Sequence, residues 1–110
     1  MNIDVNLINR MKKILSDKKI TFVEKRMFGG VAFMINGNMA IGTMHDGKLM
    51  ARVGPEQNDK ALELPGAAQM QMHKPAIGYI VVKPENVAID SDLEIWIDMS
   101  LSYNKVLPAK

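Results

Sequence analysis

The stretch VAFMINGNMAIGTMHDGKLMARV, residues 31–53, decides the fold because it holds two strong hairpin signals between short apolar segments. Asn36-Gly37 and Asp46-Gly47 are dipeptides that type I′ turns favour, since both central residues of such a turn need positive φ. We therefore expect a meander of three short antiparallel strands joined by two tight turns.

Two-residue loops at both turns would also fix the register of these strands, so that Phe33 faces Ala40 and Gly42 faces Ala51. One face of the meander would then alternate large and small apolar side chains, as a face covered by helices requires. That face would hold Val31, Phe33, Ile35, Ala40, Gly42, Met44, Leu49, Ala51 and Val53. The other face would be a methionine-rich patch with a polar rim, formed by Ala32, Met34, Met39, Ile41, Thr43, His45, Lys48, Met50 and Arg52.

Two amphipathic helices are predicted outside this stretch, each with one apolar stripe. In residues 4–18 the stripe is Leu7, Ile8, Met11, Ile14 and Leu15. In residues 91–103 it is Leu93, Trp96, Ile97 and Leu101. Asp4 is a suitable cap for the first helix, and Ser91 with Glu94 indicates a capping box for the second. Trp96 is expected to be buried against the face that holds Phe33.

The other segments predict a strand over residues 20–25, a short helix over 56–64, a mobile loop over 66–78, a strand over 78–82 and a frayed tail after 103. No internal repeat or linker divides the chain, so we expect one domain over residues 1–110. The predicted class is α+β, with two layers: an antiparallel sheet, made of the meander and edge strands, packs against N-terminal and C-terminal helices.

Composition narrows the function. The chain has 14 basic and 12 acidic residues, and this balance argues against nucleic-acid binding by the domain alone. Cysteine is absent, which excludes disulfides and thiol chemistry. No signal peptide and no stretch of about 20 apolar residues is present, so we expect a cytoplasmic protein with no membrane contact.

No catalytic set emerges from the sequence. His45 and His73 lack the spacing of a metal site, and the serines have no nucleophile-elbow motif around them. Acidic residues gather at the start of the last predicted helix, where the helix dipole accounts for them and a divalent-ion site is the weaker alternative. We expect neither an enzyme nor a cofactor.

The segment Arg26-Met27-Phe28-Gly29-Gly30 directly precedes the meander. It is not a phosphate-binding loop, because a strand and not a helix follows it. The glycines indicate a tight turn or bulge, but such a bulge beside Arg26 would also present backbone N–H groups to an anion. Arg26 itself is expected to hold a carboxylate, a carbonyl or an anionic ligand. These five residues and Arg52 are the candidate binding residues.

The sequences RMFGGVAFMINGNMAIG, DGKLMARVG, GYIVV and DLEIWIDMSLSYNKVLP together resemble the TfoX N-terminal domain family, over about residues 12–108. The resemblance implies a two-layer α/β domain with an antiparallel sheet, similar to secretion-chaperone-like folds. The family takes its name from a bacterial regulator of natural competence for DNA uptake, in which a second domain follows. It implies no catalytic role for the Arg26 segment.

Three functions remain open at this point. The first is a regulatory or adaptor domain that binds another protein through its methionines, which also suit a core, a second layer or a homodimer contact. The second is a small-ligand or anion-binding domain, or an enzyme, with a site near Arg26 and Arg52. The third is nucleic-acid binding through a local basic patch, formed by Lys12, Lys13, Lys18, Lys19, Lys25 and Arg26.

Overall fold

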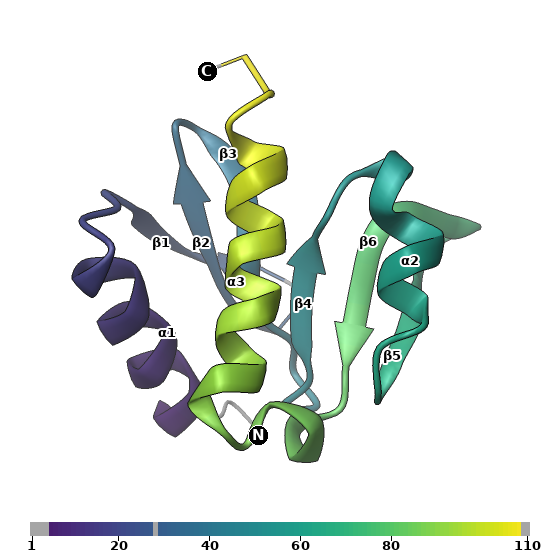
Figure 1. The fold of residues 1–110 in the computed structure, drawn as a ribbon, viewed down its shortest axis with the longest axis horizontal. Coiled ribbons are helices and arrows are strands. Elements are labelled where there is room, and N and C mark those ends of the chain that lie inside the picture. Colours follow the sequence, from purple (N-terminus) through teal and green to yellow (C-terminus); the bar gives the residue numbers. More distant parts are fainter. Residues whose placement is uncertain (1–4, 28, 109–110) are drawn as a thin grey trace.

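Antiparallel pairing joins six strands into one sheet, and the helices lie on one side of it (Figure 1). The structure is a computed structural model that describes residues 5–27 and 29–108. The strand order in this part of the chain is β1-β2-β3-β4-β6-β5. The elements are α1 (Val5–Asp17), β1 (Val23–Met27), β2 (Gly30–Ile35), β3 (Asn38–Thr43), β4 (Leu49–Arg52), η1 (Pro55–Gln57), α2 (Asn58–Leu62), β5 (Ala67–Gln71), β6 (Pro75–Val82), η2 (Pro84–Val87) and α3 (Asp90–Asn104). The predicted α+β class is confirmed.

The main hydrophobic core fills the space between the sheet and the helices. α1 buries Leu7, Ile8, Met11 and Leu15, as its stripe predicts, while Ile14 is partly buried. α3 lies beside α1 and buries Leu93, Trp96 and Ile97. Trp96 is 3% exposed and belongs to the same core cluster as Phe33, which confirms its predicted burial. The predicted cap Asp4 lies outside the described residues.

The end of α1 explains why the first strand starts later than predicted. Lys19 adopts φ 61, its N–H donates to the Ser16 carbonyl, and the Ile20 N–H donates to the Leu15 carbonyl. This is a Schellman motif, which reverses the chain and brings the next apolar residue back onto the helix. Ile20 packs on the core instead of pairing, and β1 begins only at Val23.

The first turn of the meander forms where predicted, at Asn36 (φ 54) and Gly37 (φ 80). Ile35 pairs with Asn38, but one step further the register shifts and Phe33 pairs with Ile41. Ala40 is the extra residue of a β-bulge in β3, so the predicted Phe33–Ala40 pair is wrong. The bulge places Ala40 and Ile41 in the same helix-side core, which a regular strand does not allow.

The second turn is also at its predicted place, but its loop is longer. The Gly47 N–H donates to the Met44 carbonyl at 3.0 Å, and the Met44 N–H donates to the Lys48 carbonyl at 2.9 Å. Gly47 at φ 85 completes a type I turn with a glycine bulge, the usual three-residue hairpin loop. Gly42 consequently pairs with Met50 and not with Ala51.

The two register shifts exchange the faces of four residues. Ile41 joins the helix-side core, and Thr43 lies opposite Leu49 of that core. Gly42 and Met44 move to the other face, where Gly42 pairs with Met50 and Met44 contacts the methionines. The meander is therefore confirmed as a topology, while its predicted register and these four face assignments are wrong.

Residues 66–78 form most of a hairpin and not the predicted mobile loop. β5 and β6 pair antiparallel, with a bulge between Gln69 and Gln71. The Gln69 amide donates to the Ala76 and Tyr79 carbonyls at 2.8 and 3.0 Å and exchanges hydrogen bonds with Asn58. These contacts satisfy a polar side chain inside the fold.

Both ends of α3 differ from prediction. Ile89 is the residue before the helix and makes no side-chain cap, so the predicted Ser91–Glu94 capping box does not form. Glu94 binds Lys18 instead, at 2.7 Å. At the other end Asn104 donates to the Ile35 carbonyl at 3.1 Å, and Asn38 donates to the Pro108 carbonyl at 2.9 Å. The predicted frayed tail is thus held against the first hairpin turn up to residue 108.

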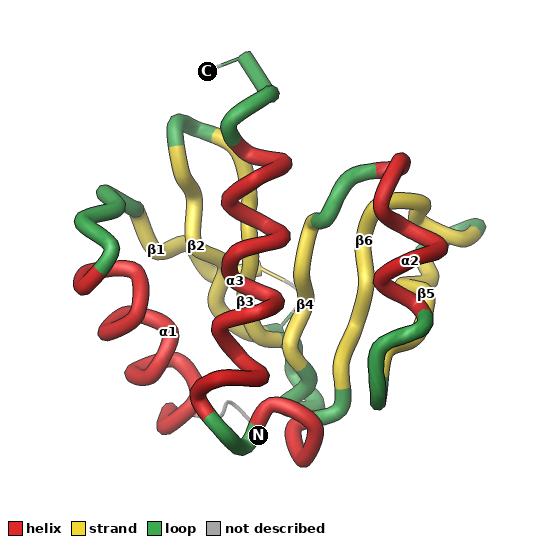
Figure 2. The backbone as a smooth tube through the Cα atoms, viewed as in Figure 1, coloured by secondary structure: helices red, strands yellow, loops and turns green. Residues whose placement is uncertain are grey.

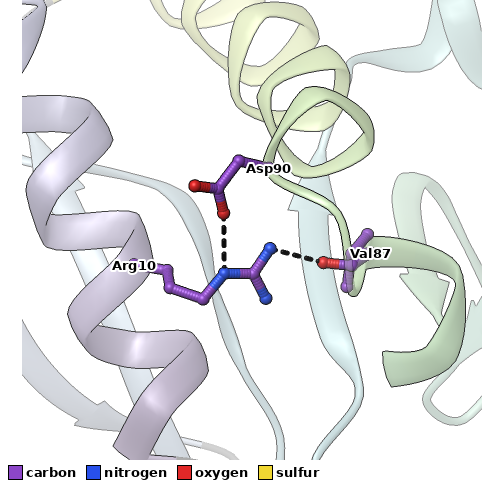
Figure 3. A network of polar contacts seen from close by, with 3 residues as sticks. All are labelled: Arg10, Val87 and Asp90. Carbon is purple, nitrogen blue, oxygen red and sulfur yellow. Dashed lines mark hydrogen bonds and ion pairs between the residues drawn. The ribbon is translucent and has the colours of Figure 1, made fainter.

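Arg10 ties α1 to the start of α3 (Figure 3). Its Nε donates to the Asp90 carboxylate at 2.8 Å, and its Nη2 donates to the Val87 carbonyl at 2.8 Å. The Arg10 side chain is 19% exposed, whereas that of Asp90 is 73% exposed. The bond to the Val87 carbonyl should therefore stabilise the fold more than the ion pair does.

We expect Arg10→Ala to lower the free energy of unfolding by about 1–2 kcal/mol, because it removes a charge-assisted hydrogen bond from a partly buried carbonyl. Asp90→Ala is the matched control and should cost less than about 1 kcal/mol, since its ion pair is exposed to water. Urea denaturation of the two variants and the wild type measures both values. Equal losses would show that the ion pair dominates.

Candidate functional site

The Arg26 segment lies at the edge of the sheet. Arg26 is exposed in edge strand β1 and pairs with Val31. No side-chain hydrogen bond or ion pair joins it to the residues that the structure describes, so the expected structural carboxylate is not found there. Met27 is partly buried, and Phe28 lies outside the described residues.

The two glycines form a structural joint between two turns. A Cβ at Gly29, which has φ 73, would lie 2.5 Å from the His45 Cβ. A Cβ at Gly30 would lie 2.0 Å from the Thr43 carbonyl oxygen. The β1–β2 turn therefore packs directly on the end of β3 and the turn that follows it, at a distance that only glycine permits.

Arg52 does not share a site with Arg26. It is the last residue of β4, and β2 and β3 separate that strand from β1. Three strand spacings of about 4.8 Å each place the two strands about 14 Å apart. The pairing also puts Arg26 near the end of the sheet where β4 starts and Arg52 at the end where β4 stops. The predicted candidate residues thus fall into two places.

Two tyrosines hold the Arg52 guanidinium. Its central carbon lies 5.3 Å from the Tyr79 ring centroid and 5.5 Å from the Tyr103 ring centroid. Tyr79 is the strand partner of Arg52, and Tyr103 comes from the last turn of α3. Sequence reasoning missed both rings, because nothing in the spacing 52, 79 and 103 indicates their proximity.

A second apolar cluster covers the sheet face that the helices leave free. Its buried members are Ala32, Met39, Met50 and Met70, and Met27, Met34, Met44, Ala76, Tyr79 and Val81 are partly buried around them. All of these come from strands or, for Met44, from the residue after β3; none comes from a helix. We call this face the methionine surface. The predicted methionine-rich patch exists, with Met27, Met44 and Met70 as additional members.

The charged residues that backbone pairing places on the methionine surface are basic. Lys25 pairs with Ala32, which places it on this face, and Lys48 pairs with Met44. Asp46 in the adjoining turn accepts a hydrogen bond from the Lys48 N–H at 3.1 Å. Burial raises the pKa of Asp46, but this hydrogen bond and the charges of Lys48 and His45 outweigh it, so the pKa falls below its usual value.

A cavity of about 570 Å³ opens on the helix side, between the residues after β4 and the last turns of α3. Val53 and Pro55 line one wall, and Met99, Tyr103 and Val106 line the other. Sequence reasoning gave no sign of this cavity, because its walls are almost 50 residues apart in the chain.

Three of the four acidic residues of α3, Asp90, Glu94 and Asp98, are held by basic partners. Lys18 binds Glu94 at 2.7 Å and Asp98 at 3.2 Å, and these hydrogen bonds raise the pKa of Lys18. Asp90 binds Arg10. Within residues 5–27 and 29–108 no group of three or more such side chains is placed to hold a metal ion.

Much of the suggested basic patch is neutralised too. Lys12 pairs with Glu24 at 2.8 Å and Lys13 with Asp17 at 3.1 Å, while Lys18 is taken by α3. These ion pairs weaken the nucleic-acid hypothesis, which depends on an uncompensated positive surface. Among the described helices, none has the length and apolarity that crossing a membrane demands.

These features define a class: a two-layer α+β domain whose six-stranded antiparallel sheet carries helices on one face and a methionine surface on the other. Within this class the chain belongs to the TfoX N-terminal domain family, whose model matches residues 17–103. The comparison with curated proteins and the comparison with solved structures each gave no match.

Proposed function

We propose that this domain is a regulatory or adaptor module that binds another protein through the methionine surface, in a process related to competence or transcription. The family membership supports the regulatory role, and the methionine surface supports the mode of action. Methionine side chains are flexible and polarizable, so a surface rich in them adapts to the shape of a partner. Catalysis is not part of the proposal.

The observation that carries the proposal is that no helix of the described chain contributes to the methionine surface, and that apolar side chains at its margin stay partly exposed. Met27, Met34 and Met44 are only partly buried. Val23, the pairing partner of Met34, is 64% exposed. Apolar side chains left partly exposed along the margin of one sheet face are typical of a protein–protein contact.

Charge favours a different protein over a second copy of this chain. Lys25 and Lys48 lie on the methionine surface, and the strand positions on this face carry no acidic residue. Two copies joined face to face would bring like charges together, which costs free energy in a desolvated contact. A partner with apolar and acidic side chains would complement the surface.

We expect the double variant Met34→Asp, Met44→Asp to lose a partner that wild-type protein captures specifically from native lysate. The new carboxylates would be desolvated in the contact and would repel an acidic partner. The matched control is Ile95→Asp, Val106→Asp, which changes two residues of the helix side that are 48% and 73% exposed. Mass spectrometry of the captured proteins, with thermal unfolding of each variant, gives the result.

Equal capture by both double variants would contradict the use of the methionine surface. A second candidate, ligand or partner binding at Arg26, has in its favour that the Arg26 side chain is exposed and without a described partner. If Arg26→Ala alone abolishes capture at unchanged stability, the site is at the sheet edge instead.

A further inference from the structure

Strand β1 forms one free edge of the sheet, and β5 forms the other (Figure 2). Residues 23–26 of β1 are exposed, so the helices leave these side chains uncovered. A free edge strand presents backbone N–H and C=O groups to which another strand can pair. What β1 can pair with depends on the order of its side chains, which is Val-Glu-Lys-Arg-Met over residues 23–27.

The free backbone groups of β1 belong to Glu24 and Arg26. The Val31 N–H donates to Thr43 Oγ1 of β3 at 3.2 Å, so it points away from β1. Arg26 is the antiparallel partner of Val31, and hydrogen-bonded pairs alternate with non-hydrogen-bonded pairs along such a ladder. The Arg26 N–H and C=O therefore point to the free edge, as do those of Glu24 two residues earlier.

A second copy of β1 can use these groups in antiparallel registers centred on residue 24, 25 or 26, if two-fold symmetry relates the copies. The registers centred on Glu24 and on Arg26 place each of these charges opposite itself, which destabilises a strand pair. The register centred on Lys25 places Glu24 opposite Arg26 of the second copy, and this pair occurs on both sides of the axis. Each such pair would exchange both of its backbone N–H···O bonds.

The other side chains of β1 also decide how well this register fits. Lys25 would face its own copy, which is a cost, but the ammonium groups end long flexible stems and can separate into water. Val23 would lie opposite Met27 of the second copy, and both side chains are apolar. Val23 is 64% exposed in the single chain, so this pairing removes apolar surface from water.

The same register supplies a carboxylate to Arg26. Within the part of the chain that the structure describes, no side-chain hydrogen bond or ion pair reaches the exposed Arg26. The Glu24 side chain is 41% exposed and binds Lys12 at 2.8 Å. An ionised carboxylate has two acceptor oxygens, so Glu24 can bind Lys12 of its own chain and Arg26 of the second copy together.

We propose that two copies of this chain pair through β1, in the register centred on Lys25, and join their six-stranded sheets into one continuous sheet. The two-fold axis is perpendicular to the sheet, so both methionine surfaces lie on the same side and meet at Val23 and Met27. This contact joins edges and not faces, so the charge argument against stacking two methionine surfaces does not apply to it. Both surfaces stay open, and the dimer does not depend on the protein partner proposed above.

Single cysteines test the register, because the chain has no cysteine of its own. In this register the two copies of residue 25 have Cα atoms about 4.5 Å apart, within reach of a disulfide. The two copies of residue 24, or of residue 26, are offset along the strands and lie more than about 7 Å apart, which a disulfide does not span. We expect Lys25→Cys to form a linked dimer at least about tenfold faster than the matched controls Glu24→Cys and Arg26→Cys under mild oxidation, because pairing raises the effective concentration of the facing thiols.

Charge reversal tests the ion pairs in purified protein without cysteine. Analytical ultracentrifugation from about 5 to about 500 μM gives the Kd of the dimer. Glu24→Arg and Arg26→Glu should each weaken it at least about tenfold, since either change turns both unlike pairs into like pairs. The double variant Glu24→Arg, Arg26→Glu should return to the wild-type Kd, and an equal mixture of the two single variants should form a mixed dimer.

Lys60→Glu is the matched control for charge. It makes the same change in net charge as Arg26→Glu, at an exposed residue of α2, and should leave the Kd unchanged. Thermal unfolding checks that each variant folds, and if a reversal variant does not fold, the cysteine series decides.

The proposal is overturned if the wild-type protein stays monomeric over this concentration range, or if Glu24→Cys or Arg26→Cys links as fast as Lys25→Cys. It is also overturned if the double reversal is as weak a dimer as the single ones. Fast linking at residue 25 together with recovery in the double reversal supports it. These measurements use the purified chain alone, so their outcome is separate from that of the capture experiment.

Discussion

Replacing Trp96 with alanine is expected to lower the free energy of unfolding by about 3–5 kcal/mol, the usual cost of truncating a buried tryptophan. Trp96 is 3% exposed and lies in the core cluster between α3 and the sheet. Truncation removes its apolar contacts and leaves a cavity in the core. Far-UV circular dichroism in a urea titration measures the loss without the fluorescence of the removed ring.

Ile95→Ala is the matched control for this prediction. Ile95 is the neighbouring residue on the same helix and is 48% exposed, so its replacement should cost less than about 1 kcal/mol. A second readout needs no variant, because Trp96 is the single tryptophan of the chain. A loss below about 1 kcal/mol in Trp96→Ala, or native tryptophan emission like that of the free amino acid, would contradict its burial.

The sequence predicted the helices and the turns, because both depend on residues that are close together in the chain. The apolar stripes of α1 and α3 repeat with the helical period, so the residues of one stripe lie on one face of the helix and are buried together. The turns at Gly37 and Gly47 also form where the dipeptides indicated them, because positive φ at these residues is a property of the turn itself.

The register could not be predicted in this way, since it depends on which turn type and which bulge the rest of the fold selects. Asp46-Gly47 suits a two-residue loop and a three-residue loop alike, and the choice moves Gly42 from Ala51 to Met50. The bulge at Ala40 allows Ile41 to join the core beneath the helices, and that packing cannot be read from the local sequence. One residue of slip reverses the faces beyond it.

The β5–β6 hairpin was missed for a related reason. Gln69 looks like a loop residue by composition, but its amide is satisfied by Asn58 of α2 and by two carbonyls of β6. Such partners come from other elements and leave no trace in the local sequence.

The candidate site shows the same limit. Arg26 and Arg52 were both identified as binding candidates from residue type, but the sequence could not say that they belong to different ends of the sheet. The two rings that contact the Arg52 guanidinium, Tyr79 and Tyr103, come from distant elements. Residue type therefore indicated the arginines, while only the fold gives Arg52 its surroundings.

Gly30→Ala is expected to destabilise the protein by about 3 kcal/mol or more, at or above the upper end of the usual cost of overpacking. The added Cβ would lie 2.0 Å from the Thr43 carbonyl oxygen and 2.6 Å from its carbonyl carbon. Both atoms belong to the backbone of β3, so no side-chain rotation relieves the overlap. Gly30 does not have positive φ, and the cost is therefore steric and not conformational.

The sign of the stability change in Gly30→Ala distinguishes a tightly packed glycine from one in an ordinary turn. Where a glycine has room for a Cβ, replacement by alanine stabilises by about 0.4–1 kcal/mol, because the unfolded chain loses freedom.

Gly29→Ala with His45→Gly is the matched comparison: removing the His45 Cβ relieves the 2.5 Å contact and leaves only the strain of φ 73. This pair should therefore recover part of the loss seen in Gly29→Ala alone. Thr43→Ala should recover little in Gly30→Ala, because the backbone oxygen stays. A Gly30→Ala protein as stable as the wild type in urea would show that the two turns do not pack at this distance, and the Arg26 segment would again be open to a binding role.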